Sequence, residues 1–217
     1  MTGTITEPAS IECNLEPINL NEKTQFNELQ RQRKICGWQY DTQTLQSWKE
    51  NENSKRLFWI TFVDSSNQVS SESTSIRAGH ISLGPSSGYL EPGRLKENEV
   101  DLSLSTFFIL PEYRALRLGR RAVRLLEEFA VTEEYGDPRC RYLTLSALSK
   151  RYIYDENWKG MWARIGMPEP SFSIQEWYER LGFVTWKEVP LYEEITLDGE
   201  TIVLWEALMS KDLRLSS

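Results

Sequence analysis

The chain has 217 residues, of which 40% are hydrophobic, and a formal net charge of -7 from 25 Lys and Arg against 32 Asp and Glu. This size suffices for one domain with a sizeable core, and we expect a loose segment at residues 1–10 followed by one domain over residues 11–213. The acidic balance argues against nucleic acid as a partner, and without an apolar run of membrane-spanning length or an apolar leader we expect no membrane partner and a cytoplasmic location, with the nucleus as an alternative.

Cysteine and histidine are scarce. Three cysteines, Cys13, Cys36 and Cys140, are odd in number and widely spaced, which fits neither a disulfide framework nor a CxxC metal motif. We interpret them as reduced, structural thiols. His80 is the only histidine, so the sequence predicts neither a bound metal nor a His-based catalytic triad.

The first part of the chain predicts an edge strand, two helices and a hairpin. Residues 11–18 alternate as an edge strand does, residues 21–35 indicate a helix, and "TQTLQSWKE" indicates a second short one. The strands "RLFWITFV" (56–63) and "RAGHISLG" (77–84) form a hairpin around the solvated turn "VDSSNQVSSESTS". A long loop, "PSSGYLEPGRLKENE", follows the hairpin.

Residues 100–109, "VDLSLSTFFI", alternate at period two and predict a strand. One predicted face carries Val100, Leu102, Leu104, Thr106 and Phe108, and the other carries Asp101, Ser103, Ser105, Phe107 and Ile109. After Pro111 the period becomes that of a helix that ends at "GDP" (136–138). Its apolar stripe comprises Leu118, Ala122, Leu125, Leu126, Phe129 and Ala130.

The last part of the chain begins with the strand "RYLTLSAL" (141–148) and a long polar and aromatic segment. A short helix, "SIQEWYERLGF" (173–183), ends at Gly182. Two strands, "VTWKEV" and "TIVLWEALM", close the chain.

Between the strand at 100–109 and its helix the chain reads "PEYRALRLGRRAVR", with five arginines around Gly119. A strand that runs into a helix whose first turn carries Gly and Arg gathers unpaired backbone N–H groups and the positive helix end at one point. Such a point binds phosphate. The alternative is a solvated basic helix face, since charge runs usually mark exposed surfaces.

Two motifs resemble the GNAT superfamily of acyl-CoA-dependent N-acetyltransferases. The stretch "LPEYRALRLGRRA" is similar to the family's motif R/Q-x-x-G-x-G/A, with Arg117 where the first glycine usually stands, and "WYERLGF" (177–183) looks like the family's helix end "LYEKLGF". The resemblance covers roughly residues 56 to 208. It implies an α/β fold in which helices flank a mixed, mostly antiparallel sheet of about six or seven strands, in a divergent, fungal-like member.

The resemblance also implies where acetyl-CoA, the cosubstrate, would bind. The backbone of Phe107, Phe108 and Ile109 would pair with the pantetheine arm. The pyrophosphate would lie against the N–H groups from 115 to 120, and Arg114 and Arg120 would add charge. Arg117 either reaches a phosphate or only packs in the turn. The whole phosphate segment comprises Arg114, Ala115, Leu116, Arg117, Leu118, Gly119 and Arg120.

For the chemistry, Tyr178 matches the tyrosine that protonates the departing thiolate in many members; the alternative is a packing role. The glutamate that some members use as base aligns with Ser103. Asp101, two residues earlier, is the nearest carboxylate, with Glu99 and His80 as further candidates. A water relayed by Ser103 and Ser105 is a further possibility, so the base stays open.

The segment 149–170 departs from the family by about twenty extra residues, and a loop of that length is usually functional or disordered. Its aromatic residues argue against disorder, and with Asp155 and Glu156 it either forms a wall of a site for a cationic amine or is a packed surface flap. We expect acetyl transfer to a primary amine, of a small molecule, by a monomer or homodimer. The alternatives are a protein amine as acceptor, or a non-catalytic acyl-CoA-binding module.

Overall fold

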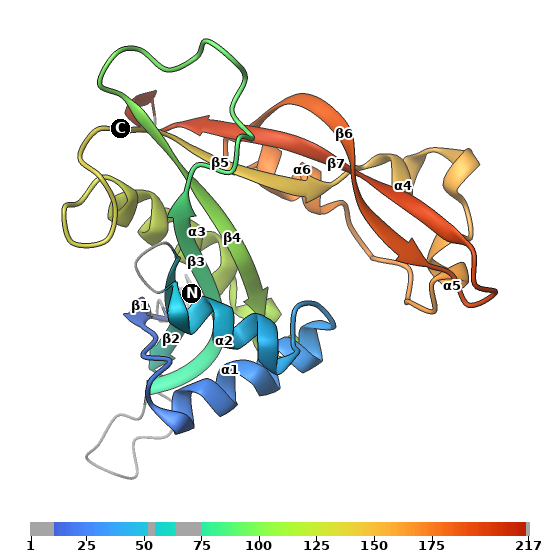
Figure 1. Cartoon of the computed structure of the whole chain (residues 1–217), viewed down its shortest axis with the longest axis horizontal. Coiled ribbons are helices and arrows are strands. Elements are labelled where there is room, and N and C mark those ends of the chain that lie inside the picture. The colour runs from blue at the N-terminus through green and yellow to red at the C-terminus, as the bar shows by residue number, and fades with distance from the viewer. Residues whose placement is uncertain (1–10, 52–54, 64–74, 216–217) are drawn as a thin grey trace, which may run out of the picture. The chain divides into compact units, whose positions relative to one another are not determined.

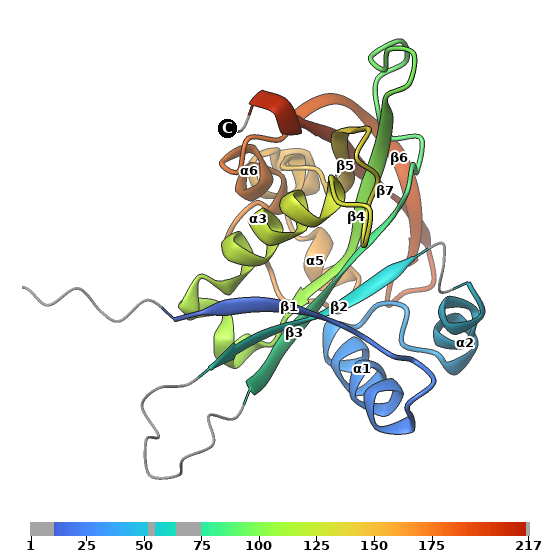
Figure 2. The ribbon, with the colours of Figure 1, turned by 90° about the vertical axis from the view of Figure 1, so that its left-hand side faces the viewer.

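The computed structural model describes residues 11–51, 55–63 and 75–215 (Figures 1 and 2). Its strands are β1 (Cys13–Pro17), β2 (Arg56–Val63), β3 (Ser75–Pro85), β4 (Val100–Ile109), β5 (Cys140–Leu148), β6 (Val184–Ile195) and β7 (Thr201–Asp212). Its α-helices are α1 (Lys23–Cys36), α2 (Thr42–Glu50), α3 (Leu118–Ala130), α4 (Arg151–Tyr154), α5 (Met161–Arg164) and α6 (Ile174–Glu179). Short 3₁₀ helices are η1 (Pro111–Leu116), η2 (Glu156–Trp158) and η3 (Leu213–Leu215).

The described strands follow the order β1-β2-β3-β4-β5-β7-β6, so the expected α/β sheet of six or seven strands has seven. The β4–β5 ladder is parallel, whereas β1–β2, β2–β3, β5–β7 and β6–β7 are antiparallel, which confirms a mixed, mostly antiparallel sheet. By contacts the chain forms two compact units, residues 1–83 with 105–128, and residues 84–104 with 129–217. Strand β4 contributes to both, its end to the first and its beginning to the second.

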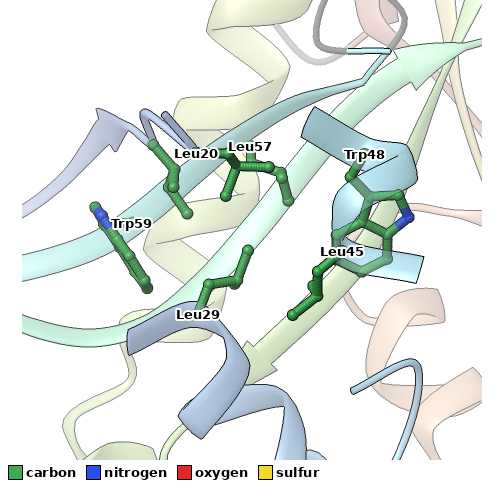
Figure 3. Packing of buried hydrophobic residues seen from close by; sticks show 7 residues of the cluster. Leu20, Leu29, Leu45, Trp48, Leu57 and Trp59 are labelled. Atoms are coloured by element: carbon green, nitrogen blue, oxygen red, sulfur yellow. The ribbon is translucent and has the colours of Figure 1, made fainter. Parts of the chain in front are cut away.

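In the first unit, α1 and α2 cover one face of the β2 strand. Leu29 of α1 and Leu45 of α2 are fully buried against Leu57 and Trp59 of β2 (Figure 3). Asp41 caps α2, because its carboxylate accepts the Thr44 N–H at 2.7 Å. Figure 2 shows α3 on the other side of these strands from α1. The predicted hairpin of β2 and β3 and the edge position of β1 are both confirmed.

The buried face of α1 is partly polar. Gln32 and Arg33 are buried beside His80 of β3, whose Nδ1 lies 2.9 Å from Gln32 Oε1 and whose Nε2 lies 3.4 Å from Arg33 Nη1. Burial, with Arg33 and Lys55 nearby, lowers the pKa of His80 to about 3. His80 is therefore a neutral core residue, and its role as a candidate base loses physical support.

In the second unit, β7 lies between β5 and β6 and is antiparallel to both. Strand β6 extends to Ile195, six residues beyond the predicted "VTWKEV", and Pro190 interrupts its register. A proline is tolerated there because β6 is an edge strand that needs no donor on its outer side. The insertion folds as α4, η2 and α5, and buries Tyr152 and Met161 against Leu204 of β7.

The helix after Pro111 ends at Ala130 and not at "GDP", because Asp137 N–H donates to the Ala130 carbonyl and the chain turns back through Gly136. A Cβ at Gly136 would lie 2.1 Å from that carbonyl oxygen, so the glycine closes the turn rather than the helix. The solvated turn predicted between β2 and β3, at residues 64–74, lies outside the described residues.

Strand β3 lies close to the end of β4 at Gly79. A Cβ there would lie 2.2 Å from the Phe108 carbonyl oxygen and 3.0 Å from Ile109 Cα, and both are backbone atoms that cannot move aside cheaply. The end of β4 is thus fixed against β3, where Leu110 N–H also donates to the Ala78 carbonyl at 2.9 Å.

We predict that Gly79→Ala costs about 3 kcal/mol or more in the free energy of unfolding, because the methyl overlaps backbone. Gly88→Ala is the matched control. Gly88 has φ of 72°, and a Cβ there would meet no other atom within 4 Å, so only backbone strain of about 1 kcal/mol is expected. Urea unfolding measures both variants, and equal losses in the two would contradict the close approach.

Candidate active site

The connection from β4 to α3 is divided by one left-handed residue. The 3₁₀ helix η1 runs over Pro111–Leu116, Arg117 has φ of 59° and ψ of 19°, and α3 begins at the next residue. Arg114 Nε donates to the Ile109 carbonyl at 3.2 Å, which ties η1 back to the strand end. The predicted phosphate segment, residues 114–120, therefore runs from the end of η1 through Arg117 into the first turn of α3.

A right-handed residue followed by a left-handed one turns successive backbone N–H groups toward the same side, an arrangement that binds anions. Leu116 and Arg117 have this order. The first turn of α3 adds N–H groups without intrahelical partners and the positive end of the helix dipole. Around them, Arg114, Arg117 and Arg120 are exposed, so the turn combines backbone donors with mobile cations suited to phosphate.

Arg117 stands where the family motif has its first glycine, and its φ shows what that position requires of the backbone. The left-handed region disfavours every residue with a Cβ, and glycine adopts it without that penalty. The chain here keeps the backbone that glycine normally provides, at a cost in strain, and gains a guanidinium at the turn. A contact between that guanidinium and phosphate stays a prediction.

The strand before the turn is irregular at Thr106. Its φ of 53° departs from the extended backbone of the other strand residues. Thr106 Oγ1 is buried and has no hydrogen-bond partner within the described residues. The residues predicted to pair with pantetheine, Phe107 to Ile109, follow directly, and the Phe108 ring lies 5.8 Å from the Arg114 guanidinium carbon.

In the second unit, Asp101 and Ser103 lie on the buried part of β4 and meet at Thr144 of β5. The hydroxyls of Ser103 and Thr144 are 2.9 Å apart, and Thr144 Oγ1 lies 3.5 Å from Asp101 Oδ2. Ser103 Oγ also accepts the Ser87 N–H at 3.2 Å. The structure therefore brings Asp101 and Ser103 together through Thr144. The same hydrogen-bonded group holds the loop after β3 through Ser87.

Glu99, the further carboxylate considered as a base, is engaged elsewhere. Its Oε1 lies 3.3 Å from Arg214 Nη1, and its Oε2 accepts the Lys96 N–H at 3.1 Å. Both partners hold the side chain at the end of the loop before β4. Glu99 is therefore held at the loop, and a role as base stays a prediction.

Tyr178 lies on α6 and is 5% exposed. Gly182, with φ of 92°, turns the chain after α6 so that Phe183 meets the Tyr178 ring edge to face at 5.5 Å. The Tyr178 hydroxyl makes no hydrogen bond among the described residues. Burial, followed by the charge of Glu206, raises the pKa of Tyr178. The phenol is thus protonated at neutral pH and its proton is not committed to another acceptor.

Glu206 of β7 is a residue that the sequence analysis missed. It is 8% exposed, and burial raises its pKa to about 7. The sequence indicates a buried carboxylate in "TIVLWEALM", where Glu206 is the single carboxylate among mostly apolar strand residues. A charged residue in that position is rarely buried without a purpose.

The aromatic residues of the insertion mostly face its own core. Tyr152 packs edge to face against Trp158 and Trp162, and its hydroxyl accepts the Trp205 N–H at 2.6 Å. Tyr154, in contrast, is 61% exposed, and its hydroxyl donates to Glu176 at 2.6 Å. The insertion is therefore an ordered part of the second unit, and a role in binding an acceptor stays a prediction.

Metal and thiol chemistry find little support in the part of the chain that the structure describes. No group of three or more His, Cys, Asp or Glu side chains there is placed to hold a metal ion. All three cysteines are free, and burial raises the pKa of Cys13 to about 11 and that of Cys140 to about 12, so both thiols stay protonated. None of the described helices is long and apolar enough to cross a membrane.

Several solved structures with this fold have the names of acetyltransferases. Arabidopsis thaliana NAA60 with a bisubstrate analogue is 13% identical, with TM-score 0.59 over 93% of this chain and 99% of that one. The aminoglycoside 6'-N-acetyltransferase from Enterococcus faecium is 15% identical (TM-score 0.54, 92% and 97% covered), and a spermidine N-acetyltransferase SpeG chimera from Vibrio cholerae and hSSAT is 12% identical (TM-score 0.54, 96% and 100%). No protein-family model and no curated protein sequence matches the chain.

The chain therefore has the fold of the GNAT acetyltransferases, which confirms the fold that the resemblance implied. At these identities the likeness establishes the fold alone. Each of these similar chains is covered almost completely, so the whole described domain, and not a fragment of it, shares the architecture.

A pair of variants separates strain from charge at Arg117. We predict that Arg117→Gly is more stable to urea than Arg117→Ala by about 1 kcal/mol, because only alanine keeps the penalty of a left-handed Cβ. Both variants lose the guanidinium, so a loss of acetyl-CoA affinity that they share measures its contact with phosphate. An alanine variant as stable as the glycine variant would contradict the left-handed turn.

Proposed function

We propose that the protein is an acetyl-CoA-dependent N-acetyltransferase. The observation that carries the proposal is the turn at Arg117, where backbone donors, a helix N-terminus and exposed arginines converge directly after an irregular strand. Solved structures with this fold were determined with acetyl-CoA or coenzyme A, which supports a nucleotide thioester as the phosphate-bearing ligand. Acetyl-CoA is a substrate of this reaction, consumed in each turnover.

The residues have the following proposed roles. Backbone groups of Phe107, Phe108 and Ile109 pair with the pantetheine arm, and an N–H near Ile109 holds the thioester carbonyl. Backbone N–H groups from Ala115 to Arg120 hold the pyrophosphate, with Arg114 and Arg120 as cations. In the second unit Tyr178 donates a proton to the departing sulfur.

The acceptor is proposed to be a primary amine of a small molecule. The names of two similar structures include an aminoglycoside and spermidine, both amines, which favours this class. The amine attacks the thioester directly in a ternary complex, so no acetylated side chain is required. Asp101 and Ser103 keep a proposed auxiliary role, since their hydrogen bonds to Thr144 orient them on β4.

The test is release of free thiol from acetyl-CoA in the presence of a panel of amines, including polyamines, aminoglycosides and peptides with a free N-terminus or lysine. Release with a small amine supports the proposal, whereas release with peptides alone would make the protein a protein acetyltransferase. Binding of acetyl-CoA without thiol release from any amine would leave a non-catalytic binding module.

Tyr178→Phe is predicted to lower kcat on the order of 10²-fold while acetyl-CoA binding is kept, because the ring and its packing stay and only the acidic proton is lost. Tyr135→Phe is the matched control. That tyrosine stacks on Phe129 at 4.6 Å, outside the proposed machinery, and should keep full turnover. An unchanged kcat of Tyr178→Phe, when chemistry limits the rate, would remove Tyr178 from the mechanism.

A further inference from the structure

Arg33 of α1 carries a buried charge that no carboxylate balances. Its side chain is 3% exposed, and its Nε is one of two buried side-chain atoms without a hydrogen-bond partner in the part of the chain that the structure describes. None of the ion pairs between described residues includes Arg33. Because arginine cannot be deprotonated in proteins, the guanidinium keeps its charge in this buried position.

A chain of hydrogen bonds fixes one nitrogen of the Arg33 guanidinium. The Gln32 amide nitrogen donates to Glu28 Oε1 at 2.9 Å and to the Arg77 carbonyl at 3.3 Å, so the amide oxygen faces His80. His80 Nδ1, 2.9 Å from that oxygen, therefore carries the proton, and His80 Nε2 accepts from Arg33 Nη1 at 3.4 Å. The side edge of the guanidinium, formed by Nε and Nη2, has no partner among the described residues.

No negative charge reaches Arg33 through this chain. Glu28, at its far end, is already paired with Arg31 at 2.7 Å. Gln32 is uncharged, and His80 is neutral near pH 7 because burial lowers its pKa to about 3. The Arg33 guanidinium is thus held by a hydrogen bond but not compensated, which costs free energy in a buried position.

Lys55 brings a second cation to the same place. Its Nζ lies 4.2 Å from the centre of the Trp48 ring, and the Arg33 guanidinium carbon lies 5.9 Å from the centre of that ring. Trp48 packs with Leu45 in the core of the first unit (Figure 3). Lys55 is half-buried and forms no ion pair with a described residue. Two like charges therefore lie against one aromatic ring, an arrangement that a bound anion would stabilise.

The chemistry of the two cations favours a carboxylate. The Nε and Nη2 hydrogens of a guanidinium form a planar fork that matches two carboxylate oxygens, and a lysine ammonium adds a point charge. Lys55 is the more exposed of the two cations, so an anion reaches Arg33 past the flexible lysine side chain. Inorganic phosphate shares this chemistry, and experiment separates the two anions.

The two cations lie near the strand end that is proposed to hold pantetheine. The ring of His80, which contacts Arg33, lies 5.7 Å from the ring of Phe108. Gly79 adjoins His80 and fixes β3 against the Phe108 carbonyl. All of these residues belong to the first unit. A small molecule with its carboxylate at Arg33 therefore has its other end near the end of β4.

We propose that Arg33 and Lys55 bind the carboxylate of the acceptor, so that the acceptor is an amino acid or another small amine that carries a carboxylate. This inference rests on the proposed acetyl transfer and names the acceptor class within it. An amine with several positive charges and no carboxylate would meet two like charges at this position, which disfavours it.

The binding test needs no turnover. Calorimetry compares amino acids with their methyl esters, which keep the amine and the side chain but lack the negative charge. The parent should bind at least one amino acid about tenfold or more tightly than its ester, because hydrogen bonds to charged groups are lost in the ester. Inorganic phosphate that binds as tightly as the amino acid and competes with it would assign the two cations to a free oxyanion and overturn the proposal.

A variant test assigns the effect to the two cations. Lys55→Gln should weaken binding of the amino acid about tenfold and leave the ester unchanged. In turnover it should raise KM for the amino acid and keep kcat, since the carboxylate is remote from the reacting atoms. Lys34→Gln is the matched control, because Lys34 is exposed and adjoins Arg33 on α1. It should bind and turn over as the parent does.

Arg33→Met separates binding from a structural role. Methionine keeps an unbranched chain and removes the uncompensated charge, so without ligand the variant should be at least as stable to urea as the parent. Amino acid should raise the unfolding midpoint of the parent and not that of the variant. A variant that unfolds at a lower urea concentration, with amino-acid binding by Lys55→Gln unchanged, would make the two cations structural and overturn the proposal.

The remaining outcomes separate this inference from the proposed function. If methyl esters are bound and acetylated as well as the amino acids, the carboxylate has no role, and the inference fails while the proposed function stands. If no amine is acetylated although acetyl-CoA binds, the proposed function fails, and the acceptor role of Arg33 and Lys55 fails with it.

Discussion

The left-handed backbone at Arg117 is the constraint on which the proposed cofactor site depends. If residue 117 were right-handed, η1 and α3 would join into one helix, and the N–H groups at the start of α3 would turn into intrahelical hydrogen bonds. The break keeps those groups unpaired next to the strand end that Gly79 fixes against β3. The direction of the N–H donors and the placement of the arginines therefore follow from the conformation of Arg117.

Burial shifts the pKa of one ionisable side chain in each unit, downward for His80 in the first and upward for Glu206 in the second. His80 is surrounded by Gln32, Arg33 and the nearby charge of Lys55, so its pKa falls to about 3 and its charge cannot change near neutrality. Glu206 is buried between Leu148 and Val189 of the neighbouring strands, and burial raises its pKa to about 7. Of these two, only Glu206 can exchange a proton readily at physiological pH, and it lies in the unit that holds Tyr178.

Most elements could be predicted because their patterns are local. The runs "RLFWITFV" and "TQTLQSWKE" became β2 and α2 without a residue of difference, and "TIVLWEALM" lies entirely within β7. The sequence could not show the left-handed turns at Thr106 and Arg117, because threonine and arginine carry no signal for positive φ. It also could not show that Glu206 is buried, since burial of a charge depends on distant strands and helices.

The central claim is that the turn at residues 114–120 holds the phosphates of acetyl-CoA, and calorimetric titration with acetyl-CoA tests it most directly. Gly119 lies in the first turn of α3, where a β-branched side chain would keep the pyrophosphate away from the backbone N–H groups. The account predicts that the parent binds acetyl-CoA and that Gly119→Val, with an unchanged unfolding midpoint, binds at least about tenfold more weakly. Equal affinity in the folded variant would contradict it.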